Sequence, residues 1–189
     1  MKKSIFVAAL FIAASFVSFA QDNILKNGAF EEGVPAVVTG QKKTPDTWLG
    51  FHHAQRGGMS IDEVEGKEGK GIKVTVDKVT KPVWDNYIYQ NISLTPGEYE
   101  VSYWVKATKP AAERTSLRFN IKPSTRSYLG DNNSPFSPKK KVTTDWQQVV
   151  QKVKIADDQD GLEEARFIIS FEEEGNEFFI DQVELKKIK

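Results

Sequence analysis

The sequence predicts an all-β protein built as a two-sheet β-sandwich. Beyond the first 20 residues, apolar residues alternate with polar ones at a period of two, and helical spacing is almost absent. The alternating runs recur roughly every 10 to 20 residues and are separated by turn-forming residues. Short, half-apolar strands joined by regular turns are typical of two packed sheets rather than of alternating strands and helices.

Residues 1–20 are typical of a cleavable signal peptide. Two lysines follow the initial methionine, an apolar stretch runs from Ile5 to Phe19, and Ser18-Phe19-Ala20 places small residues at the two positions that a signal peptidase reads. The apolar stretch is shorter than the roughly 20 residues that span a bilayer. We therefore expect cleavage before Gln21, export to the periplasm or the extracellular space, and no membrane insertion. Residues 21–189 would then form a single domain.

Composition narrows the classes of protein that the chain can belong to. The chain has no cysteine, so neither a disulfide framework nor lipid attachment after the signal is available. Without its first 20 residues it carries 24 basic and 26 acidic residues, a net charge of −2, which gives no attraction to nucleic acid. A domain of about 150 residues buries roughly 70% of the surface of its unfolded chain. We expect the hydrophobic core alone to hold the fold.

Four alternating runs predict strands with one face toward this core, and turn residues separate them. Thr95-Pro96-Gly97 predicts a tight turn with a positive φ at the glycine. The stretch 123–141 has no pattern and predicts a long surface loop. The predicted core-facing residues are Ile72, Val74 and Val76; Tyr99, Val101, Tyr103, Val105 and Ala107; Leu117, Phe119 and Ile121; and Ala165, Phe167, Ile169 and Phe171.

The same alternation predicts a face that combines aromatic and polar side chains. Trp104 would point outward between Ser102 and Lys106, an unusual place for the largest apolar side chain. The segment from Trp84 to Ile92, interpreted as a neighbouring strand, would place Tyr87, Tyr89 and Asn91 on one face and Ile88 and Ile92 on the other. Arg118 and Asn120 would join the polar face from the next strand.

Sugars require this combination of side chains. A pyranose ring presents an apolar C–H face that lies on an aromatic ring, while its hydroxyl groups need hydrogen-bond donors and acceptors around the edge. The predicted carbohydrate-binding residues are Trp104, Tyr87, Tyr89, Arg118, Asn120, Trp84 and Trp48.

Several of these residues have a purely structural alternative. Trp104 can be covered by the 123–141 loop, and Tyr87 and Tyr89 can be ordinary cross-strand packing residues. Trp48 lies in a segment, with Phe51 and His52, that could line one end of a groove, but it fits the core equally well. Trp146 is interpreted as structural, and Arg126 and Tyr128 could reach a ligand or be solvated.

Four short phrases resemble one family of modules. They are Asn23-Ile24-Leu25-Lys26-Asn27-Gly28-Ala29-Phe30-Glu31, the run LTPGEYEVSYWVKA from Leu94 to Ala107, Thr143-Thr144-Asp145-Trp146-Gln147-Gln148-Val149, and Phe178-Phe179-Ile180-Asp181-Gln182-Val183-Glu184-Leu185. Their order and spacing are similar to those of carbohydrate-binding modules of families four, nine and twenty-two. The resemblance covers a whole module, from about Asn23 to Leu185, and implies a galactose-binding-like jelly roll.

The resemblance also implies a structural calcium ion. In modules of this kind the acidic residue after the first Phe and the Asp of the last strand join backbone carbonyls around the ion, and here those positions are Glu31 and Asp181. Calcium takes about 6 to 8 oxygen ligands. Without the resemblance, Glu31 would be interpreted as a turn residue and Asp181 as an exposed strand residue. A zinc site is not predicted, because the chain has no cysteine and its two histidines, His52 and His53, are adjacent.

The sequence contains no recognisable catalytic arrangement. No pair of carboxylates is singled out for glycoside hydrolysis, and there is no nucleophile elbow or phosphate loop. We therefore predict a non-catalytic, exported protein that binds a polysaccharide or oligosaccharide. A separate glycan-degrading enzyme is a second expected partner. The alternative is a structural module that binds a protein or cell-wall partner and recognises no free sugar.

Overall fold

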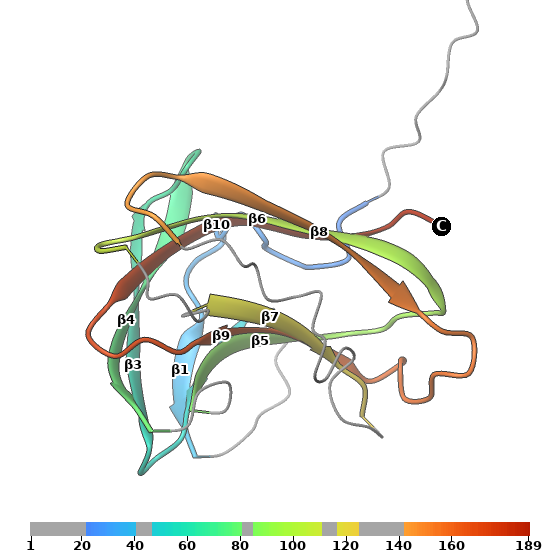
Figure 1. Ribbon diagram of the computed structural model, residues 1–189, viewed down its shortest axis with the longest axis horizontal. Helices are drawn as coiled ribbons and strands as arrows, with labels where there is room; N and C mark the ends of the chain where they lie inside the picture. Colours follow the sequence, from blue (N-terminus) through green and yellow to red (C-terminus); the bar gives the residue numbers. More distant parts are fainter. Residues whose placement is uncertain (1–21, 41–46, 81–84, 111–116, 125–141) are drawn as a thin grey trace, which may run out of the picture.

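The computed structural model describes residues 22–40, 47–80, 85–110, 117–124 and 142–189, with strands throughout and two sheets of five strands (Figure 1). The first sheet has the order β1-β2-β5-β9-β7 and the second the order β3-β4-β10-β6-β8. The all-β sandwich predicted from the alternation is confirmed. The predicted signal peptide lies outside the described residues.

The first sheet contains the strands Ala36–Thr39 (β1), Leu49–His52 (β2), Asn86–Ile92 (β5), Ala165–Phe171 (β9) and Leu117–Lys122 (β7). The second contains Gly57–Glu65 (β3), Lys70–Val79 (β4), Glu177–Lys187 (β10), Gly97–Ala107 (β6) and Gln147–Ile155 (β8). Only the β1–β2 pair is parallel among these described strand pairs. Figure 1 shows β5, β7 and β9 in one layer and β6, β8 and β10 in the layer that faces it.

The core lies between the two sheets and is built from alternate residues of their central strands. All the predicted inward positions of β4, β6 and β9 are buried, as is Ile121 of β7. Gly97 begins β6 with a φ of +144°, which fits the predicted turn. None of the described residues belongs to a helix long and apolar enough to cross a membrane.

One sequence-based interpretation of strand order is wrong. The segment that contains Tyr87 and Tyr89 was interpreted as a neighbour of the strand that contains Trp104. In the structure β5 pairs with β2 and β9, whereas β6 pairs with β10 and β8 in the other sheet. Alternation defines which residues share a face of a strand, but it carries no information on which sheet the strand joins.

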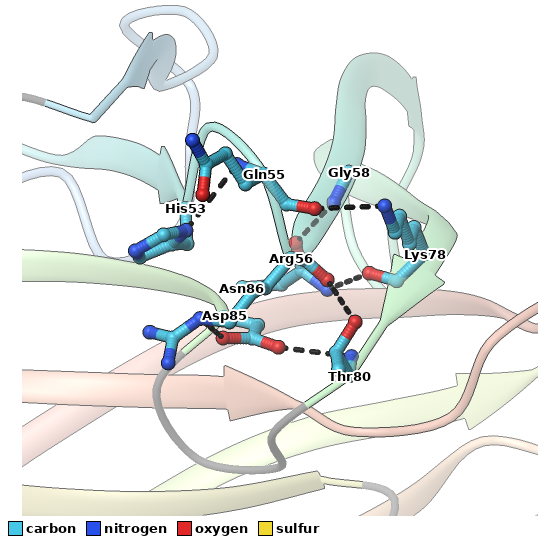
Figure 2. A network of polar contacts seen from close by, with 8 residues as sticks. All are labelled: His53, Gln55, Arg56, Gly58, Lys78, Thr80, Asp85 and Asn86. Carbon is cyan, nitrogen blue, oxygen red and sulfur yellow. Dashed lines mark hydrogen bonds and ion pairs between the residues drawn. The ribbon is translucent and has the colours of Figure 1, made fainter.

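A network of polar contacts holds the beginning of β5, directly before Tyr87 and Tyr89 (Figure 2). The Asp85 carboxylate is fully buried, lies 3.3 Å from Arg56 Nε, and accepts a hydrogen bond of 2.9 Å from the Thr80 backbone N–H. The Asn86 side chain accepts from Gly58 N–H at 2.9 Å and donates to the Lys78 carbonyl at 2.7 Å. These contacts join β5 of the first sheet to β3 and β4 of the second.

We expect Asp85→Ala to lower the free energy of unfolding by about 2–3 kcal/mol, because it removes the buried counter-charge of Arg56 and one of the two acceptors of the Thr80 N–H. Thermal unfolding should show a decrease in Tm of about 4–10 °C. Asp62→Ala is the matched control, because Asp62 pairs with Lys73 at 3.5 Å but has a side chain that is 59% exposed. Equal losses in the two variants would contradict a structural role for the Asp85 network.

Candidate functional site

The outer face of the first sheet carries a second cluster of apolar side chains, separate from the core. In β5, Ile88 and Ile92 join the core, while Tyr87 and Tyr89 join Phe51 and Ile168 on the opposite face. We call these four residues the outer aromatic cluster. The rings of Phe51 and Tyr87 are stacked with centroids 4.7 Å apart, and those of Tyr87 and Tyr89 meet edge to face at 5.6 Å. The predicted division of this strand into two faces is therefore confirmed.

Strand register places two further predicted site residues in the same cross-strand rows. Tyr87 lies opposite Ser170, which lies opposite Arg118. Tyr89 lies opposite Ile168, which lies opposite Asn120. The backbones of Arg118 and Asn120 thus belong to the sheet of Tyr87 and Tyr89, one strand further away than predicted; their side chains are not described.

The tyrosine rings are not open platforms. Tyr89 has no exposed surface, Tyr87 is 5% exposed, and the guanidinium carbon of Arg166 lies 5.5 Å from the centroid of the Tyr89 ring. A guanidinium at this distance makes a cation–π contact with the ring. The guanidinium of Arg166 therefore lies over the Tyr89 ring.

A cavity of about 660 Å³ lies where β5 ends, at Gln90, Asn91 and Ile92. This volume is typical of small-molecule sites. Its polar lining includes Lys26, Gln90, Asn91, Lys122, Glu164 and Arg166. Sequence reasoning placed Asn91 on the outer face and missed the others, of which Gln90 is on the same face of β5 as Ile88 and Ile92. Arg166 alternates with Ala165 and Phe167, so its outward position was readable from the sequence, but its approach to Tyr89 depends on the β5–β9 pairing.

The chain near the N-terminus forms one wall of this cavity. The Gln90 amide brackets the backbone of Lys26, accepting from its N–H at 2.8 Å and donating to its carbonyl at 2.9 Å. Next to Gln90, the buried Oδ1 of Asn91 accepts no hydrogen bond from any residue that the structure describes. A buried acceptor without a partner costs about 1–3 kcal/mol, and a ligand hydroxyl would supply the missing donor.

Trp104 lies on the opposite side of the sandwich from the outer aromatic cluster, so the predicted single face that contains both does not exist. It is half-buried on the outer face of the second sheet, with Lys67 Nζ 4.9 Å from its ring centroid. Further along this face Lys106 Nζ lies 4.9 Å from the Trp146 ring and 4.8 Å from the Phe179 ring. These aromatic rings are in contact with lysine ammonium groups.

Trp48 is a core residue, which corrects its prediction as a sugar-binding residue. It is 4% exposed, packs between Phe30 and Phe167 with centroids 5.7 and 6.0 Å away, and donates its indole N–H to the Asn27 carbonyl at 3.2 Å. Trp84, Arg126 and Tyr128 lie outside the described residues.

The two predicted metal ligands converge on one hairpin loop, between β3 and β4. Asp181 Oδ2 accepts from the backbone N–H groups of Lys67 and Glu68 at 2.8 and 3.1 Å, and Glu31 Oε1 accepts from that of Lys70 at 2.9 Å. Asp181 is fully buried, so its interpretation as an exposed strand residue is wrong. Burial raises the pKa of the Asp181 carboxyl above its ordinary value of 3.8, and the negative charge of Glu31 raises it further, against backbone hydrogen bonds that lower it.

The backbone around these carboxylates adopts uncommon conformations. Phe30, directly before Glu31, has a φ of +54°, and Gln182, directly after Asp181, has a φ of +49°. A β-bulge interrupts β10 between Asp181 and Glu184. Left-handed non-glycine residues cost free energy and cluster at functional sites, and here two of them flank the two acidic residues.

Comparisons with known proteins agree on the class of module. A family model described as a carbohydrate binding domain matches residues 22–172. Among curated proteins no sequence matches the chain. The solved structures that match include a proposed sugar-binding protein of Bacteroides thetaiotaomicron, with a TM-score of 0.68 and 18% identity over 88% of this chain and 100% of that one.

Two more solved structures have similar coverage. A CBM4 module has a TM-score of 0.60 and 24% identity over 86% of this chain and 99% of that one. The TmCBM61 module, solved in complex with β-1,4-galactotriose, has a TM-score of 0.51 and 16% identity over 88% and 99%. At these identities the likeness establishes the fold.

The contact between the β3–β4 loop and Glu31 can be tested with two glycines. We expect Gly69→Ala to destabilise the protein more than Gly175→Ala, because a Cβ at Gly69 would collide with Glu31 Oε1, whereas one at Gly175 would meet its nearest atom at 3.8 Å. Their φ angles are +62° and +72°, so the conformational cost of about 1–2 kcal/mol is shared. Urea unfolding measures both variants, and the extra loss in Gly69→Ala reports the cost of moving the Glu31 carboxylate away from the Lys70 N–H; equal losses would contradict a stabilising role for that hydrogen bond.

Proposed function

Because this chain belongs to the family of carbohydrate binding domains, we propose that it is an exported, non-catalytic protein that captures a polysaccharide or oligosaccharide at the outer face of the first sheet. The observation that carries the proposal is the polar cavity beside the outer aromatic cluster, in which no described residue donates a hydrogen bond to Asn91 Oδ1. Export is supported by the signal-like pattern of residues 1–20.

The cavity supplies both kinds of contact that a sugar ring needs. The guanidinium plane of Arg166, backed by the Tyr89 ring, offers a flat surface for the ring, and its N–H groups are hydrogen-bond donors. Asn91 adds an acceptor, and Lys26 and Lys122 add donors around the edge. In this arrangement the tyrosines act beneath the guanidinium rather than as the stacking surface itself.

The assignment as non-catalytic is supported by the family match. A binding domain holds a glycan without cleaving it. Any cleavage of that glycan would be carried out by a separate glycan-degrading enzyme. Incubating the protein with every glycan that it binds, followed by analysis of chain length, should reveal no product.

We propose that Glu31 and Asp181 hold a structural calcium ion together with backbone carbonyls. Two carboxylates directed at one loop provide the oxygen donors that calcium prefers. The burial of Asp181 and its repulsion by Glu31 disfavour the charged form of Asp181, and a divalent cation would relieve both effects. When bound, the ion would tie the β3–β4 loop to the N-terminal segment and to β10.

A second candidate function is supported by the outer face of the second sheet. Trp104, Trp146 and Phe179 are half-buried there, and Val150 is 50% exposed. An apolar surface interspersed with lysines suits a protein or cell-wall partner better than a groove for a free sugar. This is the interaction-module alternative.

A glycan array followed by affinity gel electrophoresis distinguishes the two functions. We expect Asn91→Ala to weaken glycan binding about 10-fold, which corresponds to one lost hydrogen bond of about 1.4 kcal/mol. Trp104→Ala, on the opposite face, is the control and should bind as the wild type does. Loss of binding in Trp104→Ala alone would move the site to the second sheet, and a wild-type protein that binds no glycan would favour the interaction module.

Calcium is tested by thermal unfolding with and without a chelator. We expect the chelator to lower the wild-type Tm by about 5–10 °C, since a ligand at 100 times its Kd stabilises by about 2.7 kcal/mol. Asp181→Asn should remove this response, whereas Asp62→Asn, at an exposed position of β3, should keep it. A wild-type Tm that does not respond to calcium would exclude the site.

A further inference from the structure

Three polar residues form one cross-strand row at the cavity end of the first sheet. Asn91 of β5 lies opposite Arg166 of β9, and Arg166 lies opposite Lys122 of β7. All three line the cavity. The row continues the series that contains the outer aromatic cluster, two residues further along each strand.

Arg166 is positioned but not neutralised. Its guanidinium is held over the Tyr89 ring at 5.5 Å, and among the residues that the structure describes it makes no hydrogen bond or ion pair. A half-buried arginine normally satisfies its five N–H donors with acceptors. With one face on a ring, its edge remains available, and that edge matches a carboxylate in a bidentate geometry.

The charges around the cavity favour an anion next to this row. Lys122 and Arg166 are half-buried on adjacent strands, whereas Lys26, whose backbone is held at the wall by Gln90, has an exposed side chain. The opposing charges are Glu163 and Glu164, which also line the cavity but are exposed. Water screens exposed charges strongly, so the cations on the sheet determine the local potential more than the two glutamates do.

Resting on the proposed function, we propose that this cavity selects acidic glycans. Arg166 and Lys122 would bind the carboxylate of a uronic acid. A hydroxyl of the same or the next sugar would donate a hydrogen bond to Asn91 Oδ1. The carboxylate satisfies the guanidinium edge, and the hydroxyl satisfies the buried acceptor. A neutral sugar in the same place leaves the two cations without a counter-charge.

The experiment compares polysaccharides that differ only in charge. Wild-type protein is titrated calorimetrically with β-1,4-galactan and β-1,4-glucan oligosaccharides, each before and after oxidation of the C6 hydroxyls to carboxylates. We expect the oxidised form of at least one backbone to bind 10-fold or more tightly than its neutral parent, and the difference to shrink as salt increases. Polyglutamate serves as a polyanion without sugar rings and should not bind.

Variants then test whether the row of Asn91, Arg166 and Lys122 causes the preference for the oxidised glycan. Arg166→Gln and Lys122→Gln should each reduce the preference for the oxidised form, and Arg166→Lys should only partly restore it because lysine lacks the planar fork. Glu164→Gln, which removes a negative charge from the rim, should increase it. Lys106→Gln removes a lysine from the outer face of the second sheet and should leave the preference unchanged.

Different failures have different meanings. Equal or tighter binding of the neutral forms would overturn the acidic-glycan inference and leave sugar binding intact. The same conclusion would follow if Arg166→Gln and Lys122→Gln both kept the wild-type Tm and both kept the preference for the oxidised form. Polyglutamate binding as tightly as the oxidised glycans would reduce the effect to general charge attraction and overturn it too. Absence of binding to every glycan would overturn both this inference and the proposed function.

Discussion

The core between the two sheets is the constraint on which the rest of the structure depends. Each central strand commits alternate residues to that core, and the residues between them must then face outward. In β5 and β9 three outward residues, Tyr87, Tyr89 and Ile168, form a second apolar cluster, so the first sheet is buried on both faces along part of its length. The polar row of Asn91, Arg166 and Lys122 begins where this second apolar cluster ends, and the cavity lies there.

The strands and their inward faces could be predicted because a period of two is a local property of the chain. The neighbours of each strand in the sheets could not be predicted from this pattern, and the position of the candidate site depends on them. Trp104 and Tyr89 both alternate with core residues, but one belongs to β6 and the other to β5, on opposite outer faces. Arg166 was passed over for the same reason, since a single arginine in a strand gains meaning only from the Tyr89 ring on the adjacent strand. Asp181 was found through a resemblance of short phrases, and its complete burial could not be read from alternation because β10 has a bulge there.

The molecule keeps unfavourable local features in two places, and both are candidate sites. One holds a buried acceptor and a guanidinium edge for which the described residues supply no partner; the other holds a buried carboxylate directly before the left-handed residue Gln182. Proteins tend to depart from local rules at functional positions and to recover the free energy elsewhere. Here the network around Asp85 and the large core supply that stability, and they also fix the end of β5 that leads to the outer aromatic cluster.

The position of β10 also has a consequence for the order in which the fold forms. This strand lies between β4 and β6 in the second sheet, and Val183 and Leu185 exchange hydrogen bonds with Asn23, Ile24 and Gly28 near the other end of the chain. A nascent chain that has not reached residue 187 therefore holds β4 and β6 without the strand that joins them, and residues 23–28 lack their hydrogen bonds to Val183 and Leu185. Contacts so distant in sequence close slowly. The second sheet can therefore be completed only when nearly all of the polypeptide has been made.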